Sequence, residues 1–110
     1  MRADENYISE VNSLASHIVK VARRKIKSKQ TPFAEVLFIS TQAYQAAQNI
    51  LANPTSLAAH INACACANLA LGVAITIDDE ELTNDTRTLK DILELHFRKM
   101  LFEKEELTNG

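Results

Sequence analysis

The chain has 110 residues, a net charge of −2 and 46% hydrophobic residues, values typical of one soluble globular domain spanning residues 1–110. This composition excludes disorder of the whole chain, because there is enough apolar surface to form a packed interior. Two glycines and two prolines leave few turns, so we expect long regular segments. Two cysteines and a polar N-terminal segment without a signal-peptide pattern predict a reducing, cytoplasmic setting.

The first predicted helix covers residues 4–28, where apolar residues recur every four and three positions, the spacing of one helical face. This stripe consists of Tyr7, Val11, Leu14, Ile18 and Val21. The C-terminal end of this predicted helix holds the strongest charge asymmetry of the chain. Half of the twelve basic residues fall between positions 20 and 29, with no acidic residue among them. The run is either a solvated helix terminus favoured by the helix dipole or a patch for an anionic partner. In the second case the contacts are Lys20, Arg23, Arg24 and Lys27.

The second predicted helix covers residues 32–52, with Thr31 as its N-cap and Pro32 in its first turn. Steps of four and three residues define an apolar stripe of Phe33, Leu37, Ser40, Tyr44, Ala47 and Leu51, and Val36, Ala43 and Ile50 flank it. Residues 33–41 also have a composition that suits a strand, so the choice between helix and strand stays open there.

The third predicted helix covers residues 56–75 and lies in a segment, 56–77, that has no charged residue. We interpret this segment as a dry, buried, alanine-rich helix around which the other three pack. Its length also suits a membrane span, but His60, Asn62 and Asn68 oppose that interpretation, so no membrane is expected.

Metal binding in this segment is disfavoured on geometric grounds. Cys64 and Cys66 are two residues apart and point in nearly opposite directions on a helix. His60 is expected near one end of an up-down bundle, whereas His17 and His96 are expected near mid-height. No metal and no cofactor is therefore predicted.

The fourth predicted helix covers residues 87–107, after a long acidic loop over residues 78–86. The acids of this loop do not fit a calcium loop, because Asn84 and Lys90 stand where that motif needs Gly and Glu. A counterpart to the basic run is the preferred role for these acids. Leu95 and Phe102 lie seven residues apart and form a second apolar face on the fourth helix, which predicts association.

Together these patterns predict an all-α, four-helix bundle-like single domain that packs as a homodimer. No nucleophile–base set or glycine-rich phosphate loop is visible, so an enzyme is not expected. We predict a small non-enzymatic protein that binds another protein as a regulator, adaptor, chaperone or inhibitor. Leu95 and Phe102 are its expected apolar anchors, and the basic run supplies charge complementarity. The alternative is a nucleic-acid-binding regulator that contacts phosphates through the basic run, 20–29.

Overall fold

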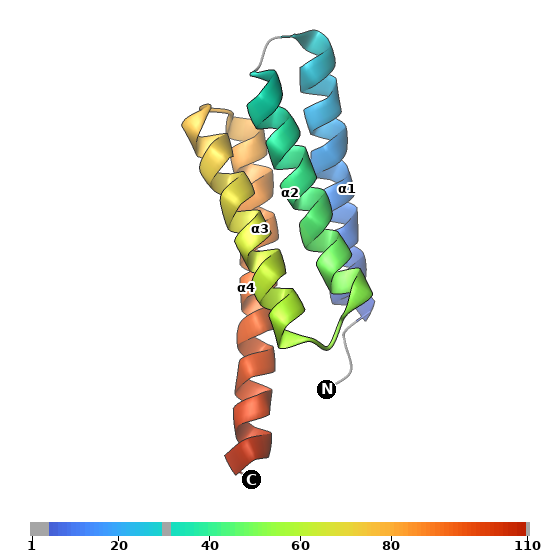
Figure 1. The fold of residues 1–110 in the computed structure, drawn as a ribbon, viewed down its shortest axis with the longest axis vertical. Helices are drawn as coiled ribbons and strands as arrows, with labels where there is room; N and C mark the ends of the chain where they lie inside the picture. Colours follow the sequence, from blue (N-terminus) through green and yellow to red (C-terminus); the bar gives the residue numbers. More distant parts are fainter. Residues whose placement is uncertain (1–4, 30–31, 110) are drawn as a thin grey trace.

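A computed structural model describes residues 5–29 and 32–109, with side chains up to Glu103. The described residues form four helices, α1 (Glu5–Ser28), α2 (Phe33–Ala52), α3 (Leu57–Thr76) and α4 (Glu80–Asn109). Consecutive helices pack side by side, and α4 also contacts α1, so that the start of α1 and the end of α4 lie at the same end of the bundle (Figure 1). The prediction of an all-α, four-helix bundle is confirmed, and residues 33–41 are helical.

The second and third helices begin and end at residues that the sequence marks. Ser56 caps α3, because its Oγ accepts a hydrogen bond from the Ala59 N–H at 3.2 Å. Helix α2 ends at Asn53, which has a non-helical conformation. Asn53 directly precedes Pro54, and a proline disfavours the helical conformation in the residue before it. Pro32 stands at the N-cap of α2 without a side-chain cap bond, and the expected cap, Thr31, lies outside the described residues.

The predicted long loop over residues 78–86 is wrong, because α4 begins at Glu80. The Asp79 carboxylate accepts a hydrogen bond from the Leu82 N–H at 2.9 Å and so caps the helix. Glu80 and Glu81 occupy the first turn, where negative charge is favoured by the helix dipole. Leu82 and Thr86 are fully buried, so this turn is part of the core. The acidic run is a helix start and not a loop.

The core face of α1 agrees with the predicted stripe, whereas that of α2 is centred on the residues expected at its flank and includes only Ala47 of the stripe itself. Phe33, Leu37, Tyr44 and Leu51 are exposed, whereas the core is formed by the neighbouring face. That buried face consists of Val36, Ile39, Ala43, Ala46, Ala47 and Ile50. Because α2 is apolar on almost every side and has one charge, Glu35, its periodicity does not distinguish one face from the other.

Helix α3 is not the fully buried rod that the sequence predicts. Its inner face consists of Ala59, His60, Ala63, Ala67, Ala70 and Ala74, all buried. The larger Ile61, Leu69 and Ile75 are 52%, 53% and 51% exposed. Alanines spaced along one face let α3 lie close to α2 and α4, its two neighbours. The expectation of burial is therefore correct for one half of this helix and wrong for the other.

The molecule is elongated, with extents of 55 × 22 × 17 Å. Helix α4 is the cause, because its C-terminal turns continue past the ends of the other three helices (Figure 1). The bundle itself is therefore shorter than the molecule, and Phe102 lies toward the C-terminal end of this longer helix.

Candidate functional site

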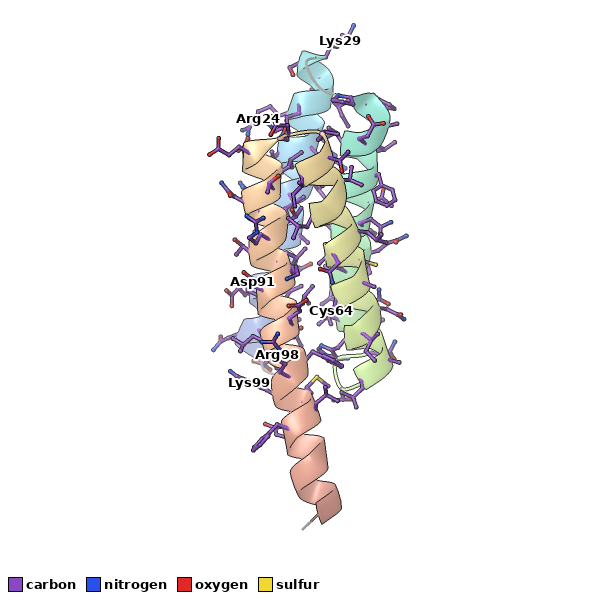
Figure 2. All side chains as sticks on the ribbon, turned by 90° about the vertical axis from the view of Figure 1, so that its left-hand side faces the viewer. Arg24, Lys29, Cys64, Asp91, Arg98 and Lys99 are labelled. Atoms are coloured by element: carbon purple, nitrogen blue, oxygen red, sulfur yellow. The ribbon has the colours of Figure 1, made fainter. Side chains whose placement is uncertain are left out.

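The strongest candidate for a functional site is the outward half of α2 and α3, which we call the α2–α3 surface. Its exposed large apolar side chains are Phe38 of α2 and Ile61, Leu69 and Ile75 of α3. The other exposed apolar residues of α2, Phe33, Leu37, Tyr44 and Leu51, lie at least about 100° from Phe38 around the helix. They follow the edge next to α1, where Tyr44 borders a depression that Ala15 and Val19 also line. Between Gln30 and Ile77 the only formal charge is Glu35. By contrast, the charged residues labelled in Figure 2 belong to α1, to α4 or, for Lys29, to the position directly after α1. Exposed apolar patches that are large and continuous are typical of surfaces that contact other molecules.

The exposed part of α3 forms a continuous stripe along the helix. Its members are Ala58, Ile61, Asn62, Ala65, Asn68, Leu69 and Gly72. Nothing lies within 4 Å of the position that a Cβ on Gly72 would take, so the stripe is open at that point. Large apolar residues, small residues and amides therefore share one solvent-facing strip with no formal charge.

The predicted basic contacts are all on the surface of α1. Lys20, Arg23, Arg24 and Lys27 line one open depression of about 320 Å³. Arg24 is also 3.2 Å from the Glu81 carboxylate at the start of α4. Three of the four cations form no ion pair among the described residues, so they are available to an anion.

The acidic run is the intramolecular counterpart of the basic run. Lys25 Nζ lies 3.1 Å from Asp79 Oδ2 and 3.3 Å from Glu81 Oε1. Burial lowers the pKa of Lys25, but the bonds and charges of the two carboxylates outweigh this effect and raise it above its ordinary value. These pairs join the end of α1 to the beginning of α4.

Leu95 and Phe102 are 55% and 63% exposed, so the second apolar face of α4 is on the surface as expected. Leu95 borders a depression of about 240 Å³ that Asn6, Tyr7 and Glu10 of α1 also line. The basic run lies at the other end of α1. Measured along α4 at 1.5 Å per residue, this end of the bundle is about 20 Å from Leu95. The structure therefore does not bring the predicted apolar anchors and the predicted basic contacts into one patch.

A buried aromatic cluster was missed by the sequence analysis. The Tyr7, His60 and His96 rings form a triangle, in which the Tyr7 centroid lies 3.7 Å from that of His96 and 5.8 Å from that of His60. His60 Nε2 lies 2.9 Å from the Pro54 carbonyl oxygen, and because a carbonyl only accepts, Nε2 is the donor. Tyr7 Oη lies 3.2 Å from His60 Nδ1. In the neutral ring, Nδ1 accepts from the Tyr7 hydroxyl. Burial, and then the nearby Cys64, raises the pKa of Tyr7, which keeps its phenol protonated.

The cluster corrects the height expected for His96. Because α4 begins at Glu80 rather than at residue 87, His96 lies level with His60, and their ring centroids are 5.5 Å apart. His17 lies elsewhere, with its Nε2 3.3 Å from Asp85 Oδ2. Among the described residues, no group of three or more His, Cys, Asp or Glu side chains is placed to hold a metal ion. The arrangement locks three helices together through ring contacts and hydrogen bonds.

Both cysteines are free thiols and half-buried on α3. Burial raises the pKa of Cys64, and Glu94 raises it further, whereas Lys90 lowers it. Burial alone raises the pKa of Cys66. Helix α3 is continuous through both residues, so their side chains diverge. Protonated thiols of this kind act as small apolar side chains.

By length and composition, Leu57–Thr76 is able to cross a membrane, and it is the single such helix among the described residues. One helix of this kind is weak support for a span, because core helices of soluble proteins share its composition. Its alanine face packs within a compact bundle, an arrangement consistent with a soluble protein.

Comparisons of this chain with protein-family models, with curated proteins and with solved structures found no match.

Proposed function

We propose that this chain is a small non-enzymatic helical protein that acts by binding another protein through the α2–α3 surface. The observation that carries the proposal is the distribution of side-chain size on α3. Its alanines face the core, while Ile61, Leu69 and Ile75 are about half exposed. Apolar area left in water is unfavourable by roughly 25 cal/mol per Å², and a partner that covers it recovers this free energy.

The low charge of α2 and α3, with Glu35 as their one formal charge, supports the same function. The centre of a protein interface is depleted in charged residues, because each charge there must lose its hydration. The polar groups on this surface are hydroxyls and amides, which form hydrogen bonds across an interface at a lower desolvation cost. The proposal moves the expected contact surface from the fourth helix to the second and third.

Affinity purification of the tagged protein from its native source, followed by quantitative mass spectrometry, tests the proposal. Leu69→Glu places a carboxylate in the α2–α3 surface, and Phe102→Glu places one on the exposed face of α4 as the matched control. We expect Leu69→Glu to lose the partner and Phe102→Glu to retain it. If Phe102→Glu loses the partner and Leu69→Glu retains it, the contact lies on α4 and the proposal is wrong.

A second candidate function is contact with nucleic acid, favoured by the four cations around one depression on α1. Phosphate contacts weaken steeply as salt rises, because bound counterions are released. Fluorescence anisotropy with a labelled duplex and a labelled single strand, at low and at physiological salt, tests it. The charge-reversed Arg23→Glu is the variant, and Arg98→Glu on α4 is its control. Absence of binding at low salt ends this candidate.

A further inference from the structure

We propose that the groove between α1 and α2 binds an acidic amphipathic helix of a partner protein. The carboxylates of this helix pair with α1, and its apolar residues cover α2. The site is separate from the α2–α3 surface and goes beyond the proposed function. The feature that carries the inference is the meeting of two unlike edges, because cations follow one side of the groove and large apolar side chains follow the other.

The groove consists of two adjoining depressions. The first, of about 290 Å³, lies between α1 and α2 and is lined by the buried Ala15 and Ala47, with Tyr44 at its α2 edge. The second, of about 320 Å³, lies among the cations of the basic run. Lys20 and Arg23 line both depressions, so the cationic and the apolar parts of the groove are continuous.

The α1 edge of the groove is cationic. Lys20, Arg23 and Lys27 are spaced by three and four residues, so they lie within about 60° of one another around the helix. All three are exposed, and none forms an ion pair within the part of the chain that the structure describes. The nearest acid on the same side of α1 is Glu5, about 22 Å from Lys20 along the helix. This edge therefore presents three unpaired positive charges at helical spacing.

The α2 edge of the groove is apolar. Its exposed large side chains are Phe33, Leu37, Tyr44 and Leu51. They lie within about 40° of one another around the helix, so they form one straight row. Glu35, the one formal charge of α2, lies about 180° from Tyr44 around the helix. Helix α2 therefore adds no negative charge to the groove.

The two edges run side by side, because α1 and α2 are neighbours that run in opposite directions (Figure 1). Val19 and Tyr44 line the same depression, so they lie at about the same height in the bundle. Leu37 precedes Tyr44 by two helical turns and is therefore level with the segment between Arg23 and Lys27. The cations thus lie across the groove from apolar side chains.

A helix laid along this groove contacts both edges at once, which is a common way of recognising amphipathic helices. The apolar row from Phe33 to Leu51 is about 27 Å long, a length that about five turns of a partner helix cover. Carboxylates spaced by three and four residues on that helix match the spacing of the cations on α1. The two requirements together define an acidic helix with one apolar face.

The positive charge alone also suits a nucleic acid, but the apolar edge favours a protein. The phosphates of a duplex contact the cations and leave the apolar row in water. A single strand stacks its bases on aromatic rings, whereas Leu37 and Leu51 are aliphatic. An amphipathic helix covers aliphatic and aromatic side chains alike, and it also supplies carboxylates to the cations.

Fluorescence anisotropy at low salt with a designed peptide tests the inference. The probe is a labelled, capped helix of about 18 residues with leucines on one face and glutamates along one side of that face. One side is sufficient, because the peptide enters the groove in the direction that places its glutamates next to α1. Control peptides have glutamine or lysine at every glutamate position. The glutamine peptide should bind about 10-fold more weakly, because the ion pairs are lost, and the lysine peptide should not bind.

Two variants of the protein test the two edges separately. Arg23→Glu reverses one charge of the α1 edge and should weaken binding of the glutamate peptide about 10-fold, whereas Arg98→Glu on α4 should not. Tyr44→Gln removes an apolar side chain from the α2 edge and should also weaken binding about 10-fold. Leu69→Gln on the α2–α3 surface is its matched control and should bind like the parent protein. All four residues are exposed on helices, and circular dichroism checks that each variant is folded.

The inference is overturned if the glutamate peptide does not bind at about 1 mM, or binds no better than the glutamine peptide. Unchanged binding by Arg23→Glu overturns it as well. Tighter binding of a labelled DNA duplex, a single strand or phosphatidylserine vesicles at the same salt shows that the cations contact another kind of anion, and it has the same consequence. Failure here is distinguishable from failure of the proposed function, because Tyr44→Gln tests the groove and Leu69→Glu tests the α2–α3 surface.

Discussion

Asp79 is predicted to stabilise the fold through two separable interactions. Its Oδ1 caps α4 by accepting from the Leu82 N–H, and its Oδ2 pairs with Lys25 of α1. Asp79→Asn keeps an amide oxygen that caps a helix equally well, but it removes the charge. Asp79→Ala removes both interactions. The pair of variants therefore separates the cap from the ion pair.

The magnitudes follow from the environment of the two groups. Loss of the cap costs about 1 kcal/mol. The carboxylate of Asp79 is 8% exposed and the Lys25 side chain 22% exposed, so their pair is shielded from water more than a surface pair. We assign this pair about 1 kcal/mol, because Glu81 remains next to Lys25 after the substitution. The free energy of unfolding should fall by about 1 kcal/mol in Asp79→Asn and about 2 kcal/mol in Asp79→Ala.

Urea unfolding at pH 7, followed by circular dichroism at 222 nm, measures both values at one protein concentration. In 1 M salt the cost of Asp79→Asn should shrink, because the ion pair is screened, whereas the difference between the variants should persist. Equal costs for Asn and Ala would refute the capping role. An unchanged stability in both variants would refute the view that α4 is anchored at its first turn.

Three further predictions concern the core and the surface of the bundle. His60→Ala should lower the free energy of unfolding by about 3 kcal/mol, because it removes a fully buried ring and two hydrogen bonds. Tyr7→Phe should lower it by about 1 kcal/mol, because it removes one of these hydrogen bonds. Urea unfolding measures both values, and equal costs for the two variants would contradict this account. Iodoacetamide should alkylate Cys64 and Cys66 more slowly in the folded protein than in urea at pH 8, as followed by mass spectrometry, and the folded protein should react faster only at higher pH. The reason is that burial raises the pKa of each thiol and keeps it protonated. Equal alkylation rates in the folded protein and in urea would contradict this prediction. Gly72→Ala should raise the stability of the dilute protein by about 0.5–1 kcal/mol, since the new methyl meets no atom within the chain; a lower thermal midpoint in dilute solution would show that the site is not open.

The existence and bounds of three helices were predictable from local signals. The apolar spacing of α1, the proline before α2 and the serine before α3 each act within a few residues of the boundary that they set. The start of α4 was missed although its signal was present. Asp79 followed by two glutamates and Leu82 is an N-cap with an acidic first turn, and Leu82, Thr86, Leu89 and Leu93 continue the core spacing.

The buried faces of α2 and α3 were not predictable from spacing. Both helices have apolar residues on nearly every side, so the inner face is decided by how closely the neighbouring helices pack and not by polarity. The error at His96 follows from the missed start of α4, because seven added residues change its height in the bundle. The exposure of Leu95 and Phe102 was predicted correctly, since α4 has enough polar residues to define its faces.

The alanines on the inner face of α3 also determine how this helix tolerates substitution. Ala63, Ala67 and Ala70 are fully buried, so enlarging any of them by even two methyl groups is expected to push neighbouring helices apart. Exchanging Ile61 or Leu69 for a polar residue leaves the isolated bundle intact, because about half of each side chain is already exposed to water. In a saturation screen for folding alone, the buried alanines of α3 would be the intolerant positions and the exposed Ile61 and Leu69 the permissive ones, the reverse of an ordinary hydrophobic core.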